Sequence, residues 1–286
     1  MDTFTGWPAD APALLAAIVA DNRAERWDAH HEDALRAPVR ALVAELHGEF
    51  GPVRVLRARV NRRFRPSVPP LRTDTGAVAG LPAGATRAVM LSATALTVTA
   101  GIHRLDAGQV RRYRAALGVD IPPDRAGPTV GDDPGGDDPG GDDPGGDDPG
   151  GDDPGGDDPA AGEPDRALGS LEPSRGGPGG VLGSGGEPGD VLARLLLDLG
   201  LAGLDPDPAG EMRGRPRGVP ADHPRLALLR RRGLQVTRSW PVGPWLATPE
   251  PLERVRAAWR AAGPLLAWLD AHAGPADLVP RPRPGG

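Results

Sequence analysis

RPRGVPADHPRLALLRRRGLQVTRSWPVGPWLATPEPLERVRAAWRAAGPLLAWL, residues Arg215–Leu269, is the stretch that decides the fold. Its pattern predicts a loop followed by a short helix over Pro224–Arg232, because proline is favoured in the first turn of a helix. A strand is predicted over Leu234–Ser239, and a turn leads from it into a long C-terminal helix. These elements indicate a domain that contains both helices and a sheet.

The long C-terminal helix is predicted to begin with Thr248 as its N-cap and Pro249 at its first position. Apolar side chains then recur at alternating spacings of three and four, at Leu252, Val255, Trp259, Ala262, Leu266 and Leu269. Such a stripe places one side of the helix against a core. Gly263-Pro264 predicts a bend near the middle of the helix.

Upstream of this stretch, periodicity and turn residues indicate further helices and strands. The expected helices cover Pro12–Asn22, the region from Trp27 to a stop at Gly48 with a kink or a new start at Pro38, Asp106–Leu117, and Asp190–Gly200. The expected strands cover Val53–Ala58, Arg87–Ser92 and Leu96–Ala100, and Arg59–Ala77 is expected to be a long loop or arm. The predicted fold class is α+β, with helices packed around a small, mostly antiparallel sheet that is interrupted by a disordered insert.

The middle of the chain has a different composition. Gly131–Ala160 consists of six copies of a five-residue unit, five GDDPG and one GDDPA. No unit carries a large apolar side chain, so little burial can offset the entropy of ordering it. The repeats also lack the apolar position of calcium β-rolls and the terminal Glu of EF-hands, which favours a linker over a calcium site. We therefore predict one domain formed by residues 1–120 and 189–274, a disordered acidic insert over residues 121–188, and a flexible tail over residues 275–286.

All 33 basic residues are Arg, and the chain contains no Cys. Without thiols there can be no disulfides, thiolate zinc sites or iron–sulfur clusters, and without Lys there can be no Schiff-base chemistry. The net charge of -6 includes twelve Asp residues in the repeats; without them, 27 acidic residues face 33 Arg, a formal charge of +6. The folded part is therefore expected to be mildly basic, which suits an anionic ligand or partial neutralisation by the acidic tract.

No stretch has the features of a membrane span or an export signal. Met1-Asp2-Thr3 lacks a basic n-region, and the longest uncharged apolar stretch, Ala88–Ile102, has 15 residues. A spanning helix needs ~20 residues. The histidines show no spacing typical of metal ligands. We expect a cytoplasmic protein without a membrane partner, a metal or a cofactor.

Several short motifs outside the insert resemble one bacterial family. They are Asp21-Asn22, Trp27, Ala29-His30, Arg63-Phe64, Gly76-Ala77, Pro216-Arg217-Gly218, Asp222-His223-Pro224, Leu228-Leu229, Arg238-Ser239 and Trp245-Leu246. Together they resemble the domain of unknown function 2461 family over Phe4–Leu117 and Gly189–His272. That family consists of hypothetical proteins without an established activity, so the resemblance implies relatives but no reaction. The segment Arg63–Thr73 lacks two lysines, an Asp and a Tyr that relatives usually carry, so a polar site built there in the family would be altered here.

The densest group of basic residues in the sequence runs from the end of the expected strand Val53–Ala58 into the predicted arm. It consists of Arg57, Arg59, Arg62, Arg63, Arg65 and Arg72. Guanidinium groups bind phosphate or carboxylate through two parallel hydrogen bonds, so an arm that folds these residues together could hold an anion. The alternative is a solvated Arg-rich loop, since arginine is abundant throughout the chain. Nucleic-acid binding is disfavoured because only Phe64 supplies an aromatic ring between the basic residues.

A second candidate lies before the short helix of the opening stretch. Arg217 and the free amides at that helix N-terminus could face an anion. His223 could move a proton, with Asp222 to orient it. The alternative is a capping loop in which the Asp and His side chains bind backbone amides.

The sequence contains no standard catalytic motif and does not decide whether the protein is an enzyme. The leading hypothesis is a protein that binds, and could act on, a small phosphate- or carboxylate-bearing ligand. The expected ligand-binding residues are Asn22, Trp27, Arg63, Arg72, Arg217 and His223. The alternative is a non-catalytic interaction or nucleic-acid-binding protein whose basic surface is modulated by the acidic insert.

Overall fold

An antiparallel sheet of six strands forms the middle of the domain in the computed structural model. The structure describes residues 3–60, 62, 67–80, 84–119, 186–207, 211–212 and 214–277. All of them belong to the unit that combines Met1–Arg125 with Gly185–Gly286. The remaining unit, Ala126–Ser184, lies outside the described residues, and with it the predicted six-repeat insert.

The strand order in the sheet is β1-β2-β3-β4-β6-β5, and all neighbouring strands are antiparallel. The strands are β1 (Val53–Val55), β2 (Asp74–Ala79), β3 (Thr86–Ser92), β4 (Ala95–Ile102), β5 (Asp205–Pro206) and β6 (Leu234–Pro241). The predicted α+β class, the β3–β4 hairpin and the strand at β6 are confirmed. Because β6 pairs with β4 over its whole length, the decisive C-terminal stretch is joined to the N-terminal half at the centre of the sheet.

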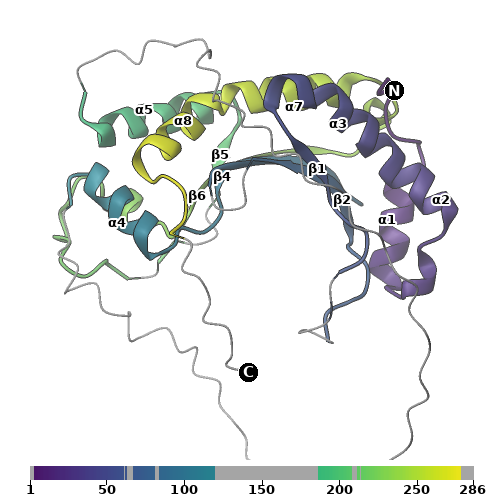
Figure 1. Cartoon of the computed structure of the whole chain (residues 1–286), viewed down its shortest axis with the longest axis horizontal. Coiled ribbons are helices and arrows are strands. Elements are labelled where there is room, and N and C mark those ends of the chain that lie inside the picture. The colour runs from purple at the N-terminus through teal and green to yellow at the C-terminus, as the bar shows by residue number, and fades with distance from the viewer. Residues whose placement is uncertain are drawn as a thin grey trace, which may run out of the picture. The chain divides into compact units, whose positions relative to one another are not determined.

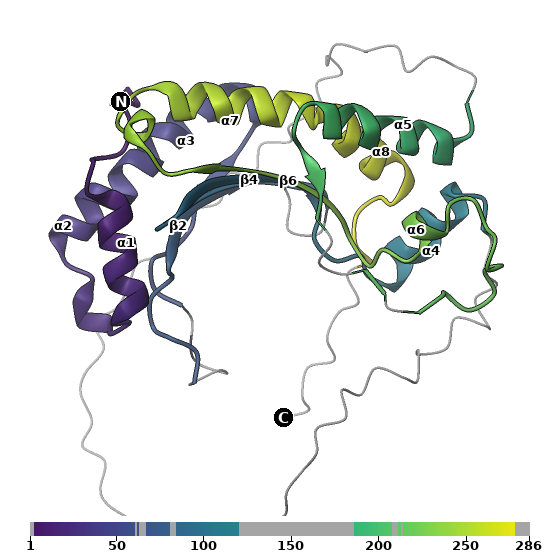
Figure 2. The same cartoon turned by 180° about the vertical axis from the view of Figure 1, so that it is seen from behind.

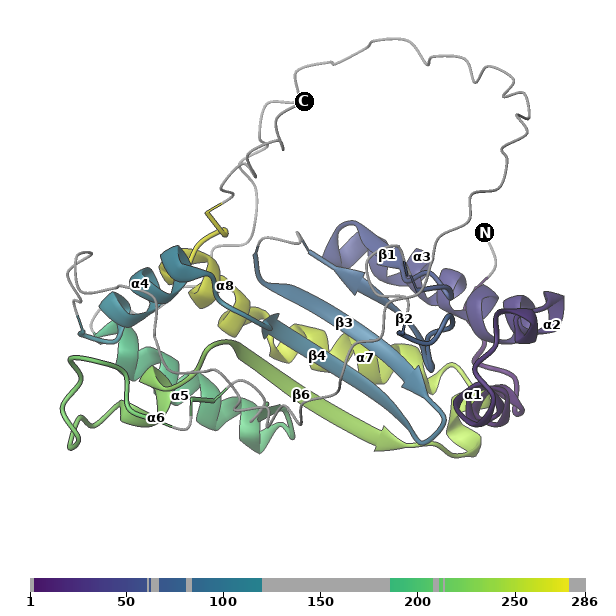
Figure 3. The same ribbon diagram turned by 90° about the horizontal axis from the view of Figure 1, so that it is seen from below.

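Helices cover one face of the curved sheet (Figure 1). They are α1 (Ala11–Ala20), α3 (Ala37–Phe50), α7 (Glu250–Ala261) and α8 (Gly263–His272). Alternate strand residues point at them: Val89, Leu91, Leu96 and Val98 are all at most 1% exposed. Figure 3 shows the strands from the side opposite α7, where the intervening residues of β4 are the half-buried Thr97 and Thr99. The alternation places the core between the sheet and these helices.

Helices α7 and α8 match the predicted C-terminal helix. Its six apolar stripe residues are all buried, and the chain divides at Ala262, beside the predicted bend. Trp259 is buried as the stripe predicted, and Trp268 is also buried in the core.

The remaining helical segments lie towards the two ends of the sheet. Helices α4 (Ala107–Ala116), α5 (Pro188–Leu201) and α6 (Leu226–Leu229) gather at the β5–β6 end, where Figure 2 shows them together. The short segments α2 (Ala29–His31), η1 (Ala24–Arg26) and the π-helix η2 (Glu32–Arg36) lie at the other end, near α1. The turn η4 (Pro244–Ala247) joins β6 to α7.

Three local predictions are wrong. The arm predicted over Arg59–Ala77 includes most of strand β2, where a Cβ on Gly76 would overlap the carbonyl of Val89 in β3. Helix α3 continues past Gly48 to Phe50 and is capped by Gly51, whose φ of 76° is the conformation that favours glycine. The helix predicted over Pro224–Arg232 is only the four-residue α6. None of the described helices is long and apolar enough to cross a membrane.

Candidate functional site

Asn22, an expected ligand residue, is engaged by the chain itself. Its Nδ2 donates to the carbonyl oxygen of Leu71 at 2.9 Å, and its Oδ1 accepts from the amide of Leu71 at 2.9 Å. The side-chain amide therefore pairs with both backbone groups of one residue, much as a strand partner does. In this position Asn22 fastens the segment before β2 to the end of α1.

Trp27 belongs to a group that we call the Glu32 cluster, formed by Trp27, Glu32, Arg36 and Arg40. The Nε1 of Trp27 donates to Oε2 of Glu32 at 3.2 Å. Glu32 also accepts from Nη1 of Arg36 at 3.1 Å and from Nη2 of Arg40. Burial acts to raise the pKa of Glu32, but hydrogen bonds from Arg40 and Trp27 and the two arginine charges lower it overall. The indole N–H of Trp27 is thus committed to a carboxylate that is already neutralised.

Arg72 is paired, and Arg63 lies outside the described residues. The Nε of Arg72 donates to Oδ1 of Asp74 at 2.8 Å, in the first residue of β2. Arg57 and Arg59 are exposed on the same segment. Arg72 is therefore paired, whereas Arg57 and Arg59 are exposed as expected for a solvated Arg-rich loop.

The second predicted group, around His223, has the geometry of a cap. Nδ1 of His223 accepts from the amide of Arg225 at 3.1 Å, just before α6. Arg217 and Asp222 are exposed and make no hydrogen bond or ion pair with another described residue. With only four residues, α6 offers little helix dipole to an anion. The arrangement of His223 is that of the capping-loop alternative.

The two predicted groups lie at opposite ends of the sheet. Asn22 and Trp27 follow α1 and η1, whereas His223 precedes α6, and Figure 2 shows α1 and α6 on opposite sides of the strands. The structure brings Asn22 and Arg72 together through Leu71, but it does not bring either close to Arg217 or His223. The described ligand residues at α1 and η1 and those before α6 therefore belong to two separate regions of the fold.

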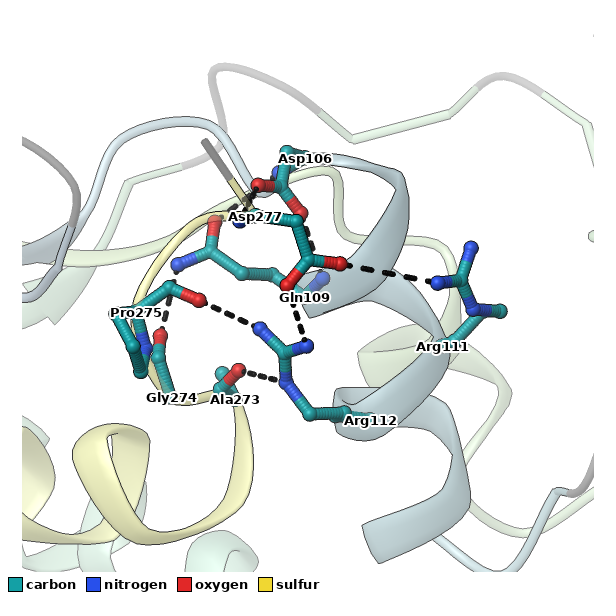
Figure 4. Close-up of polar contacts among 8 residues, drawn as sticks. All are labelled: Asp106, Gln109, Arg111, Arg112, Ala273, Gly274, Pro275 and Asp277. Carbon is teal, nitrogen blue, oxygen red and sulfur yellow. Dashed lines mark hydrogen bonds and ion pairs between the residues drawn. The ribbon is translucent and has the colours of Figure 1, made fainter. Parts of the chain in front are cut away.

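Helix α4 is fixed in place by a network that we call the C-terminal clasp, formed by Asp106, Gln109, Arg112 and residues 273–277 (Figure 4). Gln109, which is 1% exposed, donates from Nε2 to the carbonyl of Gly274 at 2.9 Å. Arg112 donates to the carbonyl of Ala273 at 2.6 Å and contacts the carboxylate of Asp277 at 3.0 Å. Asp106 completes a capping box with Gln109. The polar groups of the clasp bind one another within the chain, so the clasp positions α4 and serves the fold.

The last turn of α4 carries one member of a different arrangement, which we call the arginine pair, Arg114 and Arg231. Each guanidinium has its Nε buried without a hydrogen-bond partner in the described part of the chain. Nη2 of Arg114 contacts only the thioether of Met212, at 3.8 Å, and Nη1 of Arg231 donates to the carbonyl of Asp207 at 3.0 Å. No described carboxylate lies within ion-pair distance of either residue.

Tyr113 lies within electrostatic reach of both members of the arginine pair. Its hydroxyl, buried beneath α6, donates to the carbonyl of Leu228 at 3.1 Å. Burial raises the pKa of Tyr113, and the charges of Arg231 and Arg114 partly oppose that rise. Burial also lowers the pKa of Arg114, with the Tyr113 oxygen as the opposing group. Arg114 is therefore partly desolvated, and the charges of Arg114 and Arg231 both act on the same phenol.

An open pocket of about 490 Å³ lies along the same edge of the sheet, between β5 and β6. We call it the edge pocket; the lining residues that matter here are Gly203, Asp205, Asp207, Thr237, Ser239 and Trp240. Its volume is in the range of small-ligand sites. Asp207 also carries the carbonyl that accepts from Arg231, so the edge pocket and the arginine pair adjoin.

The polar residues that line the edge pocket are two with hydroxyls, Thr237 and Ser239, two with carboxylates, Asp205 and Asp207, and Arg238. Oγ1 of Thr237 is buried and has no partner among the described residues. The hydroxyl of Ser239 is 2.8 Å from that of Thr97 on β4, and Asp205, opposite Thr237 in the strand pairing, is exposed. Trp240 supplies an aromatic wall, and the guanidinium of Arg238 lies 4.9 Å from its ring centroid.

Sequence reasoning missed both the arginine pair and the edge pocket. Arg231 lies within the run Arg230–Arg232, which looks like ordinary arginine abundance, and Arg114 lies on a helix with several other arginines. The pocket requires residues 203–207 to pair with β6, which is a long-range contact without a local motif. In the described residues, no group of three or more His, Asp or Glu side chains could hold a metal ion.

Comparison with known proteins adds no relative to this picture. The chain matches no family model, and neither a curated protein nor a solved structure shows significant similarity to it. The resemblance to the domain of unknown function 2461 family therefore stays a prediction.

Proposed function

We propose that this protein binds a small anionic ligand, bearing phosphate or carboxylate, at the arginine pair. The observation that carries the proposal is the partial burial of Arg114 and Arg231 without a carboxylate partner in the described residues. A charge removed from water is destabilising unless an opposite charge compensates for it. A bound anion would supply that compensation. Arg87 differs, although it is also half-buried, because the charge of Asp270 already acts on it.

The chemistry of the contacts supports an anion. A thioether is a weak acceptor, so an anionic oxygen would replace the contact between Arg114 and Met212 with a stronger one. The planar guanidinium matches two oxygens of a phosphate or carboxylate at once. Because arginine stays protonated throughout the neutral range, the site keeps its charge at any physiological pH.

The neighbouring groups favour binding over a chemical step. The buried hydroxyl of Tyr113 donates a hydrogen bond to the carbonyl oxygen of Leu228, and burial raises the pKa of Tyr113. Tyr113 therefore stays protonated. The described residues around the arginine pair include no histidine or serine that contacts either guanidinium. We therefore assign the site to ligand binding by charge, at residues other than the Arg63 and Arg217 predicted from the sequence.

The test is a calorimetric titration of the full-length protein with inorganic phosphate, citrate and a short oligonucleotide. We expect phosphate or citrate to bind the wild type, and Arg114→Gln and Arg231→Gln each to weaken that binding about tenfold to a hundredfold, the usual range for a hydrogen bond to a charged group. Arg194→Gln is the matched control, because Arg194 is exposed on α5.

The proposal is contradicted if neither anion binds, or if the two variants bind as the wild type does. Oligonucleotide binding that survives both substitutions would favour the interaction protein instead. Circular dichroism of each variant verifies that the fold is retained.

A further inference from the structure

We infer that the edge pocket selects the hydroxyl groups of the ligand, so that the preferred ligand is a phosphorylated sugar or polyol. This inference rests on the proposed function, because the arginine pair would hold the phosphate. The edge pocket would then hold the neutral part of the same molecule and determine which phosphate compound binds.

The edge pocket is continuous with the arginine pair. Residues 203–207 run along β6, with Asp205 opposite Thr237 and Pro206 opposite Val236. The amide of Asp207 then donates to the carbonyl of Gln235 at 2.8 Å. Asp207 lines the edge pocket, and its carbonyl oxygen accepts from Nη1 of Arg231 at 3.0 Å. Asp207 therefore joins the edge pocket to the arginine pair. A ligand of ordinary metabolite size can contact both.

The wall of the edge pocket carries groups that can form hydrogen bonds with hydroxyls. Sugar hydroxyls both donate and accept hydrogen bonds, and the pocket offers matching groups. Ser239 is exposed at the pocket and its hydroxyl can donate and accept, while the exposed Asp205 carboxylate accepts only.

The charged groups at the edge pocket also affect which ligand fits it. Asp205 is exposed, lines the pocket and lies opposite Thr237 in the strand pairing. Its negative charge repels a second phosphate or carboxylate there but accepts hydrogen bonds from hydroxyls. Arg238 does not reverse this preference, because its Nη1 donates to the carbonyl of Ala202 at 2.8 Å and its guanidinium lies over Trp240. The site is therefore suited to a ligand with one anionic end and one neutral, hydroxylated end.

The experiment compares glucose 6-phosphate, methyl phosphate and O-phosphoethanolamine by calorimetry on the full-length protein. We expect glucose 6-phosphate to bind at least tenfold tighter than methyl phosphate. Asp205→Asn combined with Ser239→Ala should remove most of that difference, and methyl phosphate should bind this variant about as it binds the wild type. Asp198→Asn is the matched control for charge, because Asp198 is an exposed carboxylate on α5 away from the pocket lining.

The outcomes separate the two proposals. If methyl phosphate binds through the arginine pair but glucose 6-phosphate binds no tighter, the edge pocket does not select hydroxyls and this inference fails alone. It also fails alone if the pocket variant keeps the full preference, or if O-phosphoethanolamine binds tightest, which would assign Asp205 to an ammonium group. If no phosphate compound binds at all, the proposed function fails and this inference fails with it.

Discussion

The Glu32 cluster and the arginine pair contain the same cationic side chain in opposite circumstances. In the Glu32 cluster, Arg36 and Arg40 share one carboxylate that also accepts from an indole. In the arginine pair, Arg114 and Arg231 have a thioether and a carbonyl as their contacts and no described carboxylate. The comparison teaches that in an arginine-rich chain the informative property is whether a half-buried guanidinium has an acidic partner.

The largest effect that follows from this comparison is expected in the Glu32 cluster. Glu32→Gln removes the charge that Arg36 and Arg40 share, so it should lower the free energy of unfolding by about 1–2 kcal/mol, a range reduced because the carboxylate is partly exposed. Urea denaturation of both proteins measures the difference. Glu253→Gln, at a carboxylate with 66% side-chain exposure, is the control and should change stability by less than about 0.5 kcal/mol. Equal effects of the two substitutions would show that the cluster is not a stabilising unit.

In the arginine pair, removal of one charge should not destabilise the protein. Arg114→Met replaces a partly desolvated cation by an apolar side chain of similar length, beside the thioether of Met212. The free energy of unfolding without ligand should stay unchanged or rise by up to about 1 kcal/mol. Anion affinity should be lost in the same variant. A loss of stability of more than about 1 kcal/mol in urea would mean that Arg114 has a structural partner.

The difference between wild type and Glu32→Gln should depend on pH. The pKa of Glu32 lies below its usual 4.5 in the folded protein, so its stabilising contribution is complete above about pH 4.5 and decreases as the pH falls through the folded pKa. The two unfolding curves should therefore converge on acidification below pH 4.5. Curves that stay parallel from about pH 7 to about pH 3 would contradict the lowered pKa.

The smallest effect is expected at Arg217. Because Arg217 is exposed and has no described partner, Arg217→Gln should change the free energy of unfolding by less than about 0.5 kcal/mol. It should also leave anion affinity within about twofold of wild type in calorimetry. A tenfold loss of affinity would restore the site predicted from the sequence.

The elements that the sequence predicted well are those whose pattern is local and strong. The stripe from Leu252 to Leu269 and the alternation in β3 and β4 each carry their own periodicity. Strand β2 was missed because Asp74–Ala79 consists mostly of small or polar residues around Gly76, which are weak strand formers. Its place depends on pairing with β3, which no local pattern indicates.

The candidate site was less predictable than the fold for the same reason. The acidic partner of Arg72, Asp74, lies two residues away in the sequence, but Arg114 meets Met212, which only folding brings beside it. His223 lies in one of the motifs that resemble the family, but in the structure its ring caps a short helix. Composition indicated a basic surface, but it could not indicate which guanidinium groups lack compensation.

The most direct test of the central claim observes the arginine side chains themselves. In a ¹⁵N spectrum of the guanidinium Nε–H groups, assigned by single substitutions, phosphate should shift the signals of Arg114 and Arg231. The signals of Arg36 and Arg40 should stay in place, because Glu32 already occupies them. Shifts confined to the exposed arginines, or no shifts at all at saturating phosphate, would contradict the account.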